Sequence, residues 1–392
     1  MRVLVLSLSA CLSTLLVVSA AETGHFSAKV PGTFSDAKVN VAPLPADGIQ
    51  PQAAIDANGV IHVVYFTGKP PGGDLYYVKL RADGTTASAP VRVNSLAGSA
   101  LASGSVRGAQ MSLGRNGRIH VAWHGSQPVS AKDGSDVPVW YTRSADGVKF
   151  EPQRAVSGNS HGLDGGSVAA DRSGHVAVVW HALGSKPGED NRTVYLARSS
   201  DDGATFSVGA PATTAPVGAC GCCGVRAKFD RTGTLHVLYR AATDGSHRDT
   251  TWLMVQATSS RAPIRVHPWE LQSCPMSTFA LTETPDGLLA AWETAQQIYS
   301  TTLEPTTGKV GEISAMPGSG IRKHPSVAVN QAGERLIAWT EGTAWNRGGT
   351  VAWRLSDRSG AELAAEGEAG PVPVWGLVQA LALNDGSFLI LR

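Results

Sequence analysis

The sequence has little cysteine, only five residues among 392, and it has no long hydrophobic run after the first twenty positions. A membrane-spanning helix needs about 20 consecutive apolar residues, so no later segment predicts one. Lysine and arginine (33) balance aspartate and glutamate (32), and basic runs are absent, which argues against nucleic acid or an anionic membrane as a partner. No long stretch repeats its apolar residues with a period of about 3.6 residues, the period of an amphipathic helix, so the sequence excludes a helical protein.

The first 21 residues, MRVLVLSLSACLSTLLVVSAA, combine one arginine, an apolar run and small residues at the end. This pattern is typical of a secretory signal peptide, so we expect an exported protein, periplasmic or extracellular. Lipid attachment at Cys11 is the less favoured interpretation, because the apolar run continues past it. Removal of the signal would leave Cys220, Cys222, Cys223 and Cys274.

A repeat dominates the rest of the sequence. A short apolar run, a polar turn with glycine and a strand ending in an aromatic residue recur about every 50 residues, as in AQMSLGRNGRIHVAWH and SVAADRSGHVAVVWH. D-x-x-G, N-x-G and D-G turns between β-branched runs are typical of β-hairpins. A third strand such as TVYLARSS and a weaker fourth such as APVRVN follow each hairpin. Four-stranded units repeated in this way predict an all-β fold, the β-propeller.

Seven such hairpins occur, and the last one, at the C-terminus, has no outer strands after it. The segment HFSAKVPGTFSDAKVNVAP near the N-terminus could supply them and close the ring by pairing the two ends of the chain. We therefore expect a single domain over residues 22–392 with seven blades. Six blades are the alternative, if the last hairpin is only a cap.

One turn carries a family resemblance. Ser199-x-Asp201-x-Gly203-x-Thr205-Phe206 resembles the Asp-box, or BNR repeat, of sialidases and related propellers, and residues 144–150 resemble a degenerate copy. The resemblance implies the propeller fold more than an activity, since the turn is mostly structural. Sialidases also use an arginine triad, a tyrosine–glutamate nucleophile pair, an aspartate acid and an R-I-P motif. This chain lacks R-I-P, and no third arginine or tyrosine can be assigned.

Candidate residues for an exo-acting glycoside hydrolase of the sialidase type can still be named. Arg226 and Arg240 are candidates for binding a substrate carboxylate, since a guanidinium pairs bidentately with one. Glu293 and Glu341 are candidates for acid–base or nucleophile-supporting work.

Polar residues also follow the aromatic ends of the second strands, where we expect the mouth of the propeller. His124 and His181 are in this position and are candidate ligand-binding residues. A non-catalytic propeller that binds a glycan or a protein partner would use the same mouth, so the repeats do not distinguish it from an enzyme.

The cysteines lie in "GACGCCGV" and "QSCPMS", directly before the inner strands of the fourth and fifth blades. We expect these two loops to meet on one face near the axis. One interpretation is a pair of disulfides, with Cys274 joined to one member of the triplet. The other two cysteines would then pair as Cys220–Cys222 or as the vicinal Cys222–Cys223, both cramped rings.

The other interpretation is a soft-metal site. Thiolates favour Cu(I) and also suit zinc, so we expect copper first and zinc as the alternative, held by Cys220, Cys222, Cys223, Cys274 and His324. His161 or Met276 could complete the shell. The C-x-C-C and C-P motifs resemble those of a set of exported sialidase-like propellers of unclear role. Both interpretations stay open at the level of the sequence.

Overall fold

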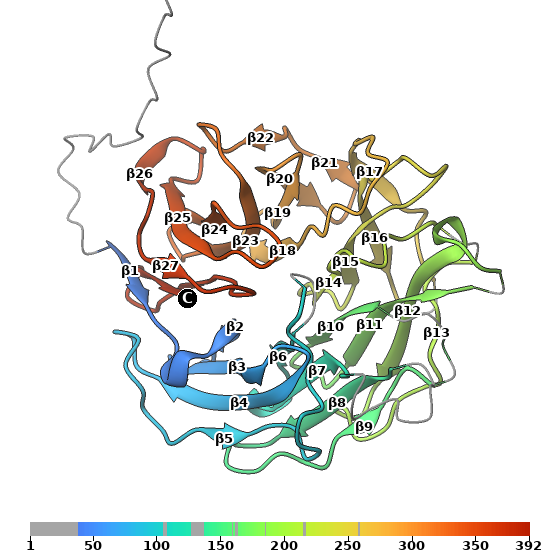
Figure 1. The fold of residues 1–392 in the computed structure, drawn as a ribbon, viewed down its shortest axis with the longest axis horizontal. Helices are drawn as coiled ribbons and strands as arrows, with labels where there is room; N and C mark the ends of the chain where they lie inside the picture. Colours follow the sequence, from blue (N-terminus) through green and yellow to red (C-terminus); the bar gives the residue numbers. More distant parts are fainter. Residues whose placement is uncertain are drawn as a thin grey trace, which may run out of the picture.

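The structure, a computed structural model, describes residues 38–104, 108–126, 137–158, 160, 164–184, 186–214, 217–257 and 259–392. Seven sheets stand in a ring around a central axis, in chain order from blue to red in Figure 1. The expected seven-bladed all-β propeller is therefore confirmed. The expected signal peptide (1–21) and His161 lie outside the described residues. Among these residues no helix is long and apolar enough to cross a membrane.

The first four blades are regular antiparallel sheets of four strands, numbered from the axis outward. Blade 1 consists of β2 (Ile49–Ile55), β3 (Ile61–Lys69), β4 (Gly72–Leu80) and β5 (Val91–Arg92). Blade 2 consists of β6 (Gln110–Leu113), β7 (Ile119–His124), β8 (Val139–Ser144) and β9 (Arg154–Ala155). Blade 3 consists of β10 (Asp164–Ala170), β11 (Val176–Leu183), β12 (Arg192–Ser199) and β13 (Ala210–Pro211). Blade 4 consists of β14 (Arg226–Phe229), β15 (Leu235–Arg240), β16 (Thr250–Val255) and β17 (Ile264–His267).

Blades 5 and 6 each split the outermost position between two short strands. Blade 5 consists of β18 (Phe279–Thr284), β19 (Gly287–Thr294), β20 (Gln297–Glu304), β21 (Lys309–Val310) and β22 (Ser314–Ala315). Blade 6 consists of β23 (Arg322–Val329), β24 (Arg335–Glu341), β25 (Gly349–Ser356), β26 (Glu362–Glu366) and β27 (Pro371–Val372). Short 3-10 turns in the described part of the chain include η2 (Pro45–Asp47), η3 (Arg115–Gly117) and η4 (Glu189–Asn191).

Blade 7 closes the ring with both ends of the described chain: β28 (Gln379–Ala382), β29 (Phe388–Leu391) and β1 (Val39–Ala42). The expected pairing of the termini is present, with one difference. Within the described residues a single N-terminal strand is added, and it runs parallel to β29, with Val39 opposite Phe388. The parallel direction brings the end of β1 to the face where β2 begins, so that the short segment through η2 suffices to enter blade 1.

The two faces of the ring differ in their connections. The inner strands begin, and the second strands end, on one face, which we call the loop face; for example, Asp164 at the start of β10 pairs with His181 near the end of β11. The hairpin turns between these strands lie on the opposite face, which we call the turn face. The cysteine loops, which precede β14 and β18, therefore belong to the loop face.

The core lies between neighbouring blades. The recurring aromatic residues of the second strands are buried there: Tyr65, Trp123, Trp180, Tyr239, Trp292 and Trp339. Burial of each large apolar side chain contributes about 1.5–3 kcal/mol relative to exposure. The repeat recognised in the sequence is thus the repeat of the interblade core.

The Asp-box turn forms as its sequence predicts. Ser199 Oγ accepts the Gly203 N–H at 2.9 Å, and Asp201 Oδ1 accepts the Thr205 N–H at 2.8 Å. Phe206 packs against Tyr141 of blade 2, with ring centroids 4.8 Å apart. The turn therefore fastens blade 3 to its neighbour.

Candidate functional site: the cysteine cluster of the loop face

Glycines allow the cysteine loop to fold tightly against its neighbours. Gly218 has φ +61°, and a Cβ there would lie 2.5 Å from Ala242 O. A Cβ at Gly221 would lie 2.8 Å from the guanidinium carbon of Arg192. The Cys220 N–H donates to Arg240 O at 2.9 Å, and the Gly224 N–H donates to Ser277 O at 2.9 Å. These bonds fix the loop to β15 on one side and to the Cys274 loop on the other.

The four cysteines form a continuous chain of sulfurs. Cys222 and Cys274 are joined by a disulfide, with Cα atoms 6.4 Å apart. Cys220 Sγ lies 3.2 Å from Cys222 Sγ, and Cys223 Sγ lies 3.0 Å from Cys220 Sγ. The cysteine loops of blades 4 and 5 thus meet, as expected. The remaining thiols are Cys220 and Cys223, a combination that differs from the two predicted pairs, Cys220–Cys222 and Cys222–Cys223.

Three of these sulfurs are arranged closely enough to share a metal ion. The Sγ atoms of Cys220, Cys222 and Cys274 all lie within 4.8 Å of one another. Two thiolates bound at about 2.3 Å to one ion stand no more than about 4.6 Å apart, so small adjustments suffice. Coordination by all three requires reduction of the Cys222–Cys274 disulfide, since a metal binds thiolates. Cys220 is buried and Cys274 is exposed, so the group has one side open to solvent.

The two thiols differ in their affinity for a proton. Burial works to raise the pKa of Cys223, but the hydrogen bond with Cys220 and the charge of Arg240 outweigh it and lower this pKa to about 7. The same hydrogen bond, together with burial, raises the pKa of Cys220. One proton shared between the two sulfurs leaves Cys223 as the thiolate of the pair.

Two arginines supply positive charge beside the sulfurs. Arg240 lowers the pKa of Cys223, and Arg248 acts against the rise of the Cys220 pKa. Arg248 Nη2 pairs with Glu189 at 2.8 Å, whereas its buried Nη1 has no hydrogen-bond partner among the described residues. An unpaired buried donor of a charged group is costly, so it indicates a place for additional negative charge. Thiolates around a metal ion would provide that charge.

Arg240, predicted to bind a substrate carboxylate, is fully buried. Its guanidinium donates to Ser277 Oγ at 3.1 Å, to Thr250 Oγ1 at 3.0 Å, to Arg248 O at 2.8 Å, to Thr294 Oγ1 at 3.3 Å and to Glu293 O. It also lies over the ring of Trp269, 4.9 Å from the centroid. A substrate carboxylate would have to displace these partners. In this arrangement the guanidinium joins blades 4 and 5 beneath the cysteines.

The two predicted catalytic glutamates occupy different surroundings. Glu293 is buried, and burial raises the pKa of its carboxyl, although Lys323 Nζ lies 3.9 Å from Oε2. Glu341 is half-buried and accepts a hydrogen bond from Trp339 Nε1 at 3.2 Å. Glu341 also faces Arg322, whose Nε is 3.6 Å away. Their catalytic role stays a prediction.

Of the two histidines expected at the mouth, His181 lies beside the cysteine loop. A Cβ at Gly165 would lie 3.6 Å from His181 Nδ1 and 3.7 Å from Cys223 O, so both flank this glycine. Burial lowers the pKa of His181 to about 4, and neither ring nitrogen has a hydrogen-bond partner among the described residues. His124 is buried at the end of β7.

His324, predicted as a metal ligand, stands apart from the three grouped sulfurs. It is buried, with Nδ1 3.3 Å from Thr278 Oγ1, and burial lowers its pKa to about 3. With Met276 it lines a small cavity of about 30 Å³. The neighbouring Lys323 donates to Pro275 O at 3.0 Å, so blade 6 contacts the Cys274 loop, as expected, through Lys323 as well as through His324.

Arg226, the other predicted carboxylate ligand, points into the axis of the ring. Its Nη1 donates to the side-chain oxygens of Gln52 (2.9 Å) and Gln110, and its Nε donates to Phe279 O at 3.2 Å. It therefore connects blade 4 to blades 1, 2 and 5 across the axis, away from the cysteines.

Sequence reasoning missed three residues of the site. Ser277 is buried, its Oγ accepts from Arg240 and lies 3.5 Å from Cys223 Sγ. Its position in C-P-M-S, three residues after Cys274, was a usable signal. Arg192 and Arg248 gave no such signal in the sequence. Arg192 begins a strand and Arg248 lies in a loop, and their approach to the cysteines depends on how the blades pack in the ring.

Comparisons with known proteins support the fold. No family model and no curated protein matches the chain. Among solved structures, a protein of unknown function from Dyadobacter fermentans is similar with a TM-score of 0.53 and 14% identity, covering 81% of this chain and 93% of that one. An α-L-arabinanase of Penicillium chrysogenum, complexed with arabinobiose, has a TM-score of 0.53 and 13% identity, covering 80% and 94%. The NanB sialidase of Streptococcus pneumoniae has a TM-score of 0.51 and 8% identity, covering 76% and 66%. The chain thus shares its propeller fold with this arabinanase and this sialidase, and at these identities the likeness extends to the fold alone.

Proposed function

We propose that the protein is an exported propeller that binds a soft metal ion, Cu(I) in the first place, through Cys220, Cys222 and Cys274. The observation that carries the proposal is the grouping of three sulfurs from two loops within 4.8 Å. Thiolate ligands favour Cu(I) over harder cations, and zinc is the alternative. The function would be metal handling or redox chemistry outside the cytoplasm.

Reduction of the disulfide by an external dithiol controls the site in this proposal: the dithiol gives up two electrons and two protons and becomes a disulfide, and Cys222 and Cys274 become thiols. With the Cys222–Cys274 bond formed, Cys220 and Cys223 are the only thiols of the described residues. With the bond reduced, three thiolates face one point, and Arg240 and Arg248 compensate their charge. Cys223 holds Cys220 by a hydrogen bond, so its role is to position that ligand.

Metal analysis after anaerobic purification with a phosphine that reduces the disulfide tests the proposal. We expect about one copper or zinc ion per chain in the wild type and its loss in Cys222→Ser and Cys274→Ser. His324→Asn is the matched control and should keep the metal, because its imidazole lies outside the group. A metal-free wild type, or equal metal content in Cys222→Ser, would reject a metal site at these sulfurs.

A glycoside hydrolase of the sialidase type is the second candidate. The arabinanase and sialidase that share the fold favour it, since the arabinanase structure is a complex with arabinobiose. The buried and fully engaged Arg240 argues against it. Assays on sialosides and uronic-acid glycosides with the wild type, Glu293→Gln and Glu341→Gln separate the two; turnover that depends on either glutamate would establish the hydrolase.

Export is proposed from the sequence of residues 1–21. N-terminal sequencing of the secreted protein is the test, and a mature N-terminus near residue 22 is expected. Retention of the intact N-terminus in the cytoplasm would contradict it.

A further inference from the structure

A second candidate site lies on the axis of the ring, and it does not depend on the cysteine cluster. A cavity of about 1170 Å³ is lined by residues of the inner strand of each blade: β2, β6, β10, β14, β18, β23 and β28. The hairpin turns of blades 1 to 4 also line it, so the channel extends to the turn face. Arg226, bound to Gln52 and Gln110, crosses it at its deep end.

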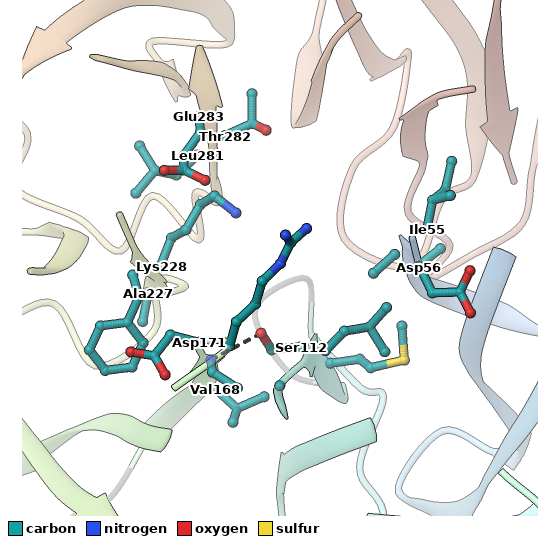
Figure 2. A pocket seen from close by; sticks show the side chains of 18 of the residues that line it. Ile55, Asp56, Ser112, Val168, Asp171, Ala227, Lys228, Leu281, Thr282 and Glu283 are labelled. Carbon is teal, nitrogen blue, oxygen red and sulfur yellow. Dashed lines mark hydrogen bonds between the residues drawn. The ribbon is translucent and has the colours of Figure 1, made fainter. Parts of the chain in front are cut away.

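Strand β14 turns two cations toward this channel. Ala227 and Phe229 are buried in the core between the blades, so Arg226 and Lys228 point the opposite way. Figure 2 shows the Lys228 side chain extending into the cavity. In the described part of the chain, Lys228 Nζ makes no hydrogen bond or ion pair, and Arg226 Nη2 makes none either.

The acids of the channel are already engaged. Each acidic side chain at the turn face has a donor within the protein: Asp56 has His62 (3.3 Å), Asp171 has His175 (2.7 Å), Asp230 has His236 (2.9 Å) and Glu283 has the Arg231 N–H (3.0 Å). Burial lowers the pKa of Lys228, and the negative charge of Glu283 acts in the opposite direction. Glu283 forms its ion pair with Arg231, whose Nε lies 3.7 Å from Oε1, and none with Lys228.

The rest of the wall mixes apolar and polar side chains. Met111 and Leu113 of β6, Leu281 of β18 and Val329 of β23 line the same space. The cations of β14 and these apolar side chains thus line one cavity. A ligand with one anionic end and an apolar body would satisfy both parts.

We propose that the channel binds an organic carboxylate, with its carboxylate held by Lys228 and Arg226 and its apolar body against the inner strands. The ligand enters from the turn face, because Arg226 and its glutamine partners obstruct the deep end. Glu283 sets a limit on the affinity, since its negative charge acts on the same ammonium group.

Isothermal titration calorimetry with octanoate on the full chain tests this site, with octanol and inorganic phosphate as comparison probes. We expect octanoate to bind the wild type and to bind Lys228→Met roughly tenfold more weakly, because this variant removes a cation from a desolvated site. We expect it to bind Glu283→Gln more tightly, because this variant removes a negative charge near the same site. Lys309→Met, an exposed lysine of blade 5, is the matched control and should match the wild type.

Each alternative result decides against the site. If octanol binds as tightly as octanoate, the cations take no part in binding. Phosphate binding without octanoate would overturn the class of ligand, and unchanged octanoate affinity in both Lys228→Met and Glu283→Gln would overturn the location. Because Glu283→Gln is expected to strengthen binding, a folding defect of Lys228→Met cannot imitate the whole pattern.

Discussion

The turn face and the loop face of this propeller are built on different rules. On the turn face the same device recurs: an aspartate carboxylate accepts the N–H groups of its own hairpin, as Asp56 does from Asn58 and Val60 and Asp230 does from Thr232 and Thr234. On the loop face, and among the described residues, only the loops of blades 4 and 5 contain cysteines. The repeated face maintains the ring, whereas the proposed metal site lies where the repeat is interrupted.

Burial separates Arg240 of the loop face from Arg231 of the turn face. Arg240 of the loop face is fully buried, whereas the Arg231 side chain of the turn face is 67% exposed. A buried charge must be satisfied by fixed partners, and removing it leaves those partners unpaired. The comparison therefore predicts a large effect of substituting Arg240 and a small effect of substituting Arg231.

Arg240→Met should have the largest effect. It would leave the buried oxygens of Glu293, Arg248 and Ser277 without their donor, at a cost of about 3–5 kcal/mol in the free energy of unfolding. Urea denaturation measures this cost. Arg231→Met should change stability by no more than about 0.5 kcal/mol. Equal effects of the two substitutions would remove the contrast between the faces.

Loss of the disulfide should have the next largest effect. Cys222 and Cys274 are 52 residues apart in the sequence, and removal of such a crosslink lowers the free energy of unfolding by about 2–4 kcal/mol. A variant with Ser at positions 220, 222, 223 and 274 should nevertheless keep its β-sheet circular dichroism, because blade 7 closes the ring elsewhere. An unfolded variant would show that the cysteines are required for the fold itself.

His181 should make stability depend on pH. Its pKa is lowered to about 4 by burial, against an ordinary value near 6.5, so below pH 6.5 the unfolded chain binds a proton that the folded protein does not. Stability should thus fall on acidification, with about 1 kcal/mol lost through this group between pH 7 and 5.5. Denaturation at both pH values, for the wild type and His181→Gln, measures it; an equal loss in both would assign the effect to other groups.

Asp385→Ala should have the smallest effect. This exposed turn-face carboxylate accepts the Ser387 N–H at 2.9 Å and the Ser387 hydroxyl at 2.6 Å. Loss of these bonds at the surface should cost about 0.5 kcal/mol, seen as a small shift of the urea midpoint with an unchanged slope. A cost above that of Cys222→Ser would contradict the ranking of the faces.

The sequence predicted what is local and repeated. Hairpin turns, buried aromatic residues and the Asp-box depend on neighbouring residues, so the seven blades and their order could be inferred. The positions of Cys222 and Cys274 before two inner strands also predicted that their loops meet. The engagement of Arg240 by Thr250, Ser277 and Glu293 could not be inferred, because it depends on how two blades pack. The separation of His324 from the sulfurs has the same cause: adjacent loops converge on one face, but backbone direction decides where each side chain lies.

Copper binding by the two redox forms of the purified protein is the decisive test of the proposed metal site. The protein as isolated under air and the protein reduced anaerobically with a phosphine are each titrated with Cu(I), and free thiols are counted beside bound copper. We expect two thiols and no tightly bound copper in the first form, and four thiols with one copper bound by sulfur in the second. Equal copper binding by both forms, or none by the reduced form, would contradict a site that opens on reduction of the disulfide.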